Sequence, residues 1–199
     1  MCGLCGVVDL GRPAERPTVD GWLDELAHRG PDGRGVFAGD GVCLGHLRLA
    51  IIDLSDAGLQ PMADGDLQLL HNGEIYNYVE LRDELRAKGY RFSTGTDSEV
   101  ILASYRECRE RCVERFNGMW AFVIWDSEQQ TLFASRDRLG IKPFYYNLDG
   151  RRLMFASEPW VLPHGGANLS AARAYLEQGF LDEGDETFFA NVVRLTLPA

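Results

Sequence analysis

The chain has 199 residues, of which 45% are hydrophobic, and a formal net charge of −10 at pH 7. This length predicts one globular domain, and the negative charge argues against binding nucleic acid or an anionic membrane surface. No apolar run is long enough to span a bilayer, and the N-terminus lacks a signal-peptide pattern, so we expect a cytoplasmic protein. Five cysteines, an odd number, fit reduced thiols better than a disulfide framework.

The first part of the sequence predicts a strand, a helix and a hairpin. An apolar segment at residues 3–10 is typical of a strand, and Thr18 is expected to cap a helix with apolar residues at helical spacing. Glycine, proline and aspartate in residues 29–33 indicate a sharp turn after this helix. Residues 36–44 contain two short apolar runs around a Gly-Asp-Gly sequence, which predicts a β-hairpin.

The central part of the sequence predicts a strand followed by two helices. An apolar run at residues 45–53 carries one cation, Arg48, and a loop separates it from a strand that begins at Leu67. Asn77 is expected to cap the first helix together with a glutamate three residues later. Thr96 repeats this signature for the second helix, which places an aspartate in the first turn, where the helix dipole favours a carboxylate.

Strands dominate the rest of the chain. Residues 119–155 contain four short runs rich in aromatic and aliphatic residues, separated by turns, and Ser170 is expected to cap a last helix. Strands, two central helices and further strands together indicate an α+β fold with two sheets and helices packed outside them.

Cys2 has the most distinctive chemistry in the sequence. Removal of Met1 would leave a residue that carries a thiol and a free α-amine on one carbon. A thiolate is a strong nucleophile, and an α-amine with a reference pKa of about 7.7–8.0 is a base near neutral pH. One residue could then act as nucleophile and general base. On the first five residues alone, a small buried cysteine is the more ordinary interpretation.

Seven segments change this weighting, because they occur together and in a fixed order. They are Cys2-Gly-Leu-Cys-Gly6, Arg29-Gly-Pro-Asp32, Arg48-Leu-Ala-Ile-Ile-Asp53, Gln60-Pro-Met62, Asn72-Gly-Glu-Ile-Tyr-Asn77, Thr96-Asp-Ser-Glu99 and Arg136-Asp-Arg-Leu-Gly-Ile-Lys-Pro143. Over residues 2–194 the chain resembles the N-terminal glutaminase domain of glutamine-hydrolysing asparagine synthetases. These are class II glutamine amidotransferases of the Ntn-hydrolase type. The resemblance implies a four-layer αββα sandwich and treats residues 1–199 as one such domain.

The resemblance also implies a set of site residues for L-glutamine. Cys2 would attack the side-chain amide, and its amine would pass the proton to the leaving ammonia. Asn72 and Gly73 would stabilise the oxyanion through a side-chain and a backbone N–H. Arg48 would bind the α-carboxylate through two parallel hydrogen bonds. Glu74 and Asp97 would bind the α-ammonium. The full expected substrate-binding set is Arg48, Leu49, Ala50, Ile51, Ile52, Asn72, Gly73, Glu74 and Asp97.

Simpler interpretations of the same residues stay open at this level. Arg48 could be an ordinary ion-pair partner, Asp97 an ordinary carboxylate at a helix start, and Asn72-Gly73 only a turn. Histidines 28, 46, 71 and 164 are expected to be structural, since the mechanism needs no imidazole. A zinc site formed by Cys2, Cys5, Cys108 and Cys112 is a weak alternative, and we expect no metal in this domain.

The relatives continue into an ATP-pyrophosphatase domain, and nothing here matches its phosphate loop. ATP and Mg are therefore expected only in that missing synthetase domain, which would be absent from a fragment or present as a separate chain. A different class II glutaminase and a non-catalytic remnant are the rival functions. The acceptor of the ammonia, aspartate or another carboxylate, cannot be read from the sequence, and neither can a homodimer. Residues 119–155 are expected to supply part of the apolar surface toward the partner domain, while most of their aromatic and aliphatic side chains are expected to fill the core between the sheets.

Overall fold

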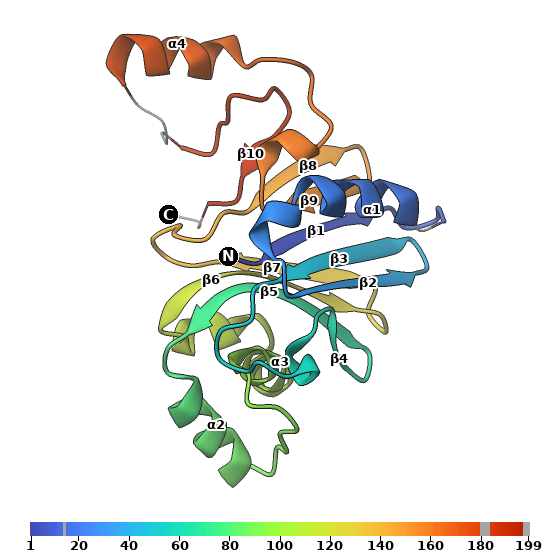
Figure 1. Ribbon diagram of the computed structural model, residues 1–199, viewed down its shortest axis with the longest axis vertical. Coiled ribbons are helices and arrows are strands. Elements are labelled where there is room, and N and C mark those ends of the chain that lie inside the picture. Colours follow the sequence, from blue (N-terminus) through green and yellow to red (C-terminus); the bar gives the residue numbers. More distant parts are fainter. Residues whose placement is uncertain (14, 180–183, 197–199) are drawn as a thin grey trace.

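The computed structural model describes residues 1–13, 15–179 and 184–196. In this part of the chain, two antiparallel sheets lie face to face (Figure 1). The larger sheet has the strand order β10 (Val193–Arg194), β8 (Tyr145–Asp149), β9 (Arg152–Ala156), β1 (Gly3–Val8), β3 (Val42–Arg48) and β2 (Gly33–Gly39). The smaller sheet has the order β4 (Met62–Asp64), β5 (Leu67–Ile75), β6 (Gly118–Asp126) and β7 (Thr131–Arg136).

Helices cover the outer face of each sheet (Figure 1). α1 (Arg16–Glu25) packs on the larger sheet, whereas α2 (Tyr78–Ala87) and α3 (Asp97–Cys108) pack beneath the smaller one. This arrangement confirms the predicted α+β four-layer αββα sandwich. α4 (Leu169–Gln178) stands outside these layers and buries none of its side chains. Short 3₁₀ turns are η1 (Ala27–Arg29), η2 (Asp56–Gly58), η3 (Arg109–Arg115) and η4 (Pro159–Val161). No helix among the described residues is long and apolar enough to cross a membrane.

The alternation of side chains along β1 explains how two of the three apolar cores are kept apart. Leu4 and Val8 point into the core between the two sheets, while Cys5 and Val7 point into the core beneath α1. Since successive residues of a strand face opposite sides, every residue of β1 is buried in one core or the other. The antiparallel register pairs Gly3 with Leu47, which brings the N-terminus to the end of β3.

Two predicted helix caps are wrong, and a third has the predicted position without the predicted bond. Thr18 lies inside α1, which begins at Arg16, and its hydroxyl donates to Glu15 Oε2 at 3.3 Å. Ser170 lies one residue inside α4, where Asn168 Oδ1 accepts from the two backbone N–H groups of residues 170 and 171. Asn77 has the predicted position before α2, but its side chain bonds the 115–117 segment instead of its own helix. The prediction for Thr96 is confirmed, since its Oγ1 accepts from the N–H of Glu99 at 3.3 Å.

The predicted apolar surface of residues 119–155 is mostly core. The residues concerned are Trp120, Phe122, Ile124, Phe144 and Phe155, all at most 2% exposed, and the half-buried Tyr145. They pack between the sheets or against the helices because β6 and β9 are central strands. The cysteine pairs are separated as well, because Cys5 packs beneath α1 and Cys112 packs on the α3 side of the molecule. A zinc site that joins the two pairs is therefore wrong.

Candidate functional site

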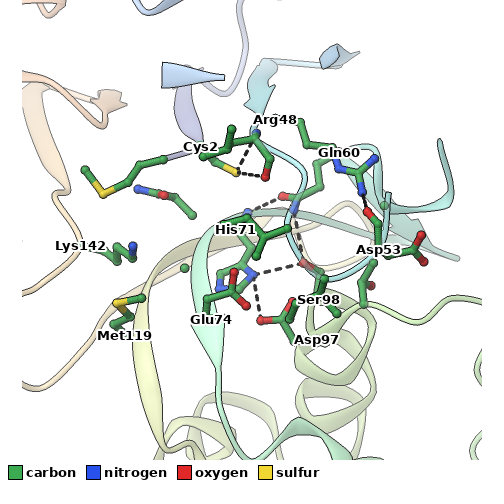
Figure 2. Close-up of a pocket in the computed structure, with 18 residues that line it drawn as sticks. Cys2, Arg48, Asp53, Gln60, His71, Glu74, Asp97, Ser98, Met119 and Lys142 are labelled. Carbon is green, nitrogen blue, oxygen red and sulfur yellow. Dashed lines mark hydrogen bonds and ion pairs between the residues drawn. The ribbon is translucent and has the colours of Figure 1, made fainter. Parts of the chain in front are cut away.

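A cavity of about 110 Å³ lies where the N-terminus, the end of β3, β5 and the start of α3 meet (Figure 2). Nine of the ten predicted site residues line it, and Ala50 does not. The lining residues are Met1, Cys2, Arg48, Leu49, Ile51, Ile52, Asp53, Gly58, Gln60, His71, Asn72, Gly73, Glu74, Thr96, Asp97, Ser98, Met119 and Lys142.

The thiol of Cys2 lies at the N-terminal end of β1 and contacts the backbone of Leu49. Its Sγ accepts a hydrogen bond from the N–H of Leu49 at 3.3 Å and lies 3.6 Å from the carbonyl oxygen of the same residue. Burial raises the pKa of the Cys2 thiol above its usual value, although the Leu49 N–H and nearby positive charges oppose this shift. A half-buried thiol with a raised pKa needs a base to become a nucleophile.

The Arg-Gly-Pro-Asp motif at residues 29–32 fixes both sides of this thiol. Arg29 Nε donates to the carbonyl oxygen of Cys2 at 2.9 Å, and the same guanidinium forms a buried ion pair with Glu158. Asp32 Oδ2 accepts from the N–H of Ala50 at 2.9 Å. Ala50 therefore shapes the segment beside the thiol from outside the cavity, instead of lining it as predicted.

Arg48 supplies a cation at one end of the cavity. The residue is only 7% exposed, and its guanidinium donates only to backbone carbonyls, those of Ser55 at 2.6 Å and of Asp53. Within the described residues no carboxylate lies in ion-pair contact with it. A buried guanidinium without an anionic partner is suited to bind a carboxylate from a ligand.

Asn72 and Gly73 lie in the middle of β5, so the turn interpretation of this dipeptide is wrong. The side-chain Nδ2 of Asn72 is buried and has no hydrogen-bond partner among the described residues. Such a donor is costly unless a ligand or water satisfies it. A Cβ on Gly73 would lie 2.2 Å from the carbonyl oxygen of Met119, so glycine is required for this close strand contact.

Two carboxylates lie close together on the other side of the cavity. Asp97 begins α3, is 5% exposed, and accepts a hydrogen bond from the N–H of Ile75 at 2.8 Å. Burial, and then the charge of Asp97, raise the pKa of Glu74 to about 7, while Lys142 opposes this shift. Two neighbouring carboxylates in a buried place repel each other, and a cationic ligand group between them would relieve the repulsion.

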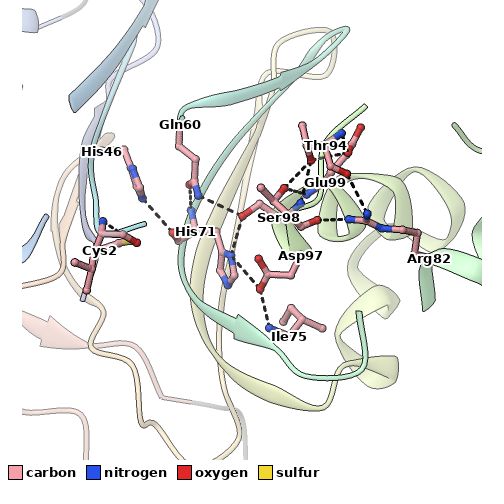
Figure 3. A network of polar contacts seen from close by, with 12 residues as sticks. Cys2, His46, Gln60, His71, Ile75, Arg82, Thr94, Asp97, Ser98 and Glu99 are labelled. Atoms are coloured by element: carbon pink, nitrogen blue, oxygen red, sulfur yellow. Dashed lines mark hydrogen bonds and ion pairs between the residues drawn. The ribbon is translucent and has the colours of Figure 1, made fainter. Parts of the chain in front are cut away.

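A network behind the cavity holds β5 against α3 (Figure 3). His71 Nδ1 lies 3.1 Å from Ser98 Oγ and 4.0 Å from Asp97 Oδ2, and the backbone N–H of His71 donates to Gln60 Oε1. His46 Nε2 lies 3.1 Å from the carbonyl oxygen of His71. Burial lowers the pKa of both histidines, that of His46 to about 3, so both imidazoles are neutral near pH 7. Their role is to hold neighbouring segments, as expected, but His71 lies within the site.

Several residues of the site were missed from the sequence, although most belong to the seven segments. Gln60, Ser98 and Lys142 occur in three of those segments, in which no role was expected for these members. Gly58 lies in a loop without any local signal and packs against the guanidinium of Arg48. Their function depends on contacts between distant segments, which periodicity and turn chemistry do not reveal.

Comparison with known proteins agrees with this geometry. A family model described as "Glutamine amidotransferase domain" matches residues 1–198. The chain is 46% identical over 164 residues to asparagine synthetase [glutamine-hydrolyzing] 3 of Bacillus subtilis (strain 168), which covers 79% of this chain and 26% of that protein. It is 41% identical over 178 residues to putative asparagine synthetase [glutamine-hydrolyzing] 2 of Methanocaldococcus jannaschii, which covers 79% of this chain and 34% of that protein.

A solved structure extends the comparison to the fold. The glutamine phosphoribosylpyrophosphate amidotransferase from B. subtilis superimposes with a TM-score of 0.68 at 22% identity, over 80% of this chain and 42% of that one. The chain thus spans about a quarter to a third of the length of the two synthetases. Because the family model covers nearly every residue, the chain belongs to the glutamine amidotransferase domain family.

Proposed function

We propose that this domain hydrolyses L-glutamine to L-glutamate and ammonia, with Cys2 as the nucleophile after Met1 has been removed. One observation carries the proposal: the Cys2 thiol and the unpartnered amide of Asn72 line a single cavity, with an unpaired guanidinium at one end. Family membership supports the same reaction.

Substrate orientation follows from the charges around the cavity. Arg48 receives the α-carboxylate, and Glu74 and Asp97 receive the α-ammonium, so the side-chain amide extends toward Cys2. Glutamine itself supplies the cation that the two carboxylates lack. Its zwitterionic end is thereby recognised by groups of opposite charge, and this recognition favours a free amino acid over a peptide glutamine.

The chemical step needs a base, because burial keeps the thiol protonated. With Met1 removed, the α-amine of Cys2 accepts the thiol proton while sulfur attacks the amide carbon. The C–N bond then breaks, the amine returns the proton to the leaving ammonia, and a thioester remains. Asn72 Nδ2 and the N–H of Gly73 stabilise the oxyanion. Water attacks the thioester in the same way, which releases glutamate and restores the thiol.

The ammonia is proposed to serve an ATP-dependent amidation, such as asparagine synthesis from aspartate, carried out by a synthetase domain outside this chain. The identities with asparagine synthetases support this role. Leu139 and Ile141 are 84% and 52% exposed, and their loop lines a surface hollow together with Met1, next to the catalytic cavity. An exposed apolar loop at this place is suited to contact the second domain.

Two variants of the 199-residue chain test the glutaminase proposal. Cys2→Ala should reduce ammonia release from glutamine to background, while Cys5→Ala, buried beneath α1, should keep most of it. Mass spectrometry should show that active protein begins at Cys2. Wild-type activity from Cys2→Ala, or full activity from protein that verifiably retains Met1, would refute the proposal. Calorimetry with ATP and Mg should show no saturable binding to this domain.

A further inference from the structure

Lys142 is a second cation in the catalytic cavity, and the proposed reaction gives it no role. The residue is only 7% exposed, yet its side chain lines the cavity, on the side opposite Arg48 (Figure 2). In the described part of the chain, its ammonium has neither a hydrogen-bond nor an ion-pair partner. An ammonium that lines the cavity without a partner of its own acts on the charged groups that share this cavity.

The loop that carries Lys142 is fastened by hydrogen bonds to β6. Asp137 accepts hydrogen bonds from the N–H groups of residues 139, 141 and 142, the last at 2.9 Å. The same carboxylate accepts from the N–H of Trp120 at 3.3 Å, and the N–H of Asp137 donates to the carbonyl of Trp120 at 2.7 Å. Trp120 pairs with Gly73 across the sheet, and the next pair is Met119 with Glu74. The backbone of Lys142 is thus fixed relative to Glu74.

Glu74 faces charged and titratable groups from every element around the cavity. These are Cys2, Arg48, Asp53, His71, Asp97 and Lys142. The carboxylate of Asp53 already accepts hydrogen bonds from Ser55 and Gly95. Arg48 is reserved for the substrate carboxylate. In the view of Figure 2, Glu74 lies between Asp97, which disfavours its ionisation, and Lys142, which favours it.

We propose that Lys142 is a positioning residue that keeps Glu74 ionised in the empty site, so that this carboxylate is ready to receive the α-ammonium of glutamine. The inference rests on the proposed function, and it deepens the account of substrate selection. Without Lys142, two adjacent buried carboxylates would share one proton more readily, and the incoming ammonium would meet a neutral carboxylic acid. Lys142 acts through Glu74 and touches no reacting atom.

The pH dependence of glutamine hydrolysis by Lys142→Met tests this idea. The acid limb of the kcat/KM profile reports groups of the free enzyme. It should move to higher pH in Lys142→Met, with a loss of about tenfold at about pH 6.5 for each unit by which the pKa of Glu74 rises. The loss should fall below about twofold at about pH 9, where Glu74 is ionised in both proteins. Lys142→Arg should restore the wild-type profile.

Two controls separate this effect from other causes. Glutaramate lacks the α-amine of glutamine but still requires the Cys2 amine as base, so its profile should not move in Lys142→Met. Lys88→Met removes an exposed lysine that pairs with Glu107, away from the cavity, and should leave every profile unchanged. Equal losses for both substrates, or an equal loss at every pH, would overturn the proposal.

A measurement without turnover distinguishes a failure of this inference from a failure of the proposed function. The side-chain carboxyl of Glu74 can be titrated by NMR in the wild-type chain, Lys142→Met and Lys142→Arg, after circular dichroism has established folding. The pKa of Glu74 should be higher in Lys142→Met than in the other two proteins, and equal values would overturn the inference. If Lys142→Met does not fold, Lys142→Gln takes its place. A wild-type chain that hydrolyses no glutamine would refute the proposed function alone.

Discussion

A methyl group at position 58 should weaken glutamine binding by displacing the guanidinium of Arg48. Gly58 ends the short η2 turn, and a Cβ at this position would lie 2.3 Å from Arg48 Nη2 and 2.8 Å from Arg48 Cζ. Both separations are below the 3.0 Å that real Cβ contacts respect. Since the opposing atoms form the free end of a long side chain, the guanidinium should move and the backbone should not.

The displaced guanidinium would lose its bonds to the carbonyls of Ser55 and Asp53 and its alignment with the substrate carboxylate. A hydrogen bond to a charged group contributes about 1.5–3 kcal/mol. The KM for glutamine in Gly58→Ala should therefore rise about 10- to 150-fold, at about 1.4 kcal/mol per factor of ten. The kcat should change little, because Cys2 and Asn72 keep their positions.

Steady-state ammonia release over a wide range of glutamine concentrations measures both constants. Gly21→Ala is the matched control, because no atom lies within 4 Å of a Cβ added to this helical glycine, and alanine favours a helix. Its KM should equal that of the wild type. An unchanged KM in Gly58→Ala would refute the assigned role of Arg48, and so would a large drop in melting temperature that accounts for the loss.

Asn72→Ala should lower kcat by about 10²- to 10³-fold with little change in KM, because it removes an oxyanion donor; a loss confined to KM would contradict this role. Calorimetry can measure how tightly the inactive Cys2→Ala variant binds glutamine at different pH values. Below pH 7 the affinity should fall by up to about tenfold per pH unit, because the pKa of Glu74 is raised to about 7 and this carboxylate becomes neutral at lower pH. The same raised pKa means that the folded state holds a proton that the unfolded state releases between pH 4.5 and 7, so this carboxyl makes the protein less stable as pH rises through that window. In urea unfolding, the free energy of unfolding of Glu74→Gln should therefore fall less between about pH 5 and 8 than that of the wild type. Cys5→Ala should cost about 1 kcal/mol of unfolding free energy, because it leaves a small void under α1, while kcat/KM stays within about twofold.

The sequence specified those parts of the fold that depend on neighbours along the chain. The hairpin turn at Asp40-Gly41 forms as predicted, with Gly41 at φ +65°. Thr96 caps α3, and Gly89 ends α2 with φ +98°. The seven ordered segments contain 14 of the 18 residues that line the cavity, because a set of motifs in register carries information that no single residue holds.

Only the tertiary structure decided how these groups act together. Asn77 carries a capping signature, yet its amide binds the 115–117 segment, because two backbone groups of that segment satisfy both ends of the amide at once. Cys2 meets Leu49 through the pairing of β1 with β3, and Asp97 reaches the N–H of Ile75 across 22 residues. Lys142 faces Glu74 only because Asp137 fastens its loop to β6. Local sequence propensity does not predict such contacts. They form only when the two sheets stack and the strand register determines which strand ends lie next to each other.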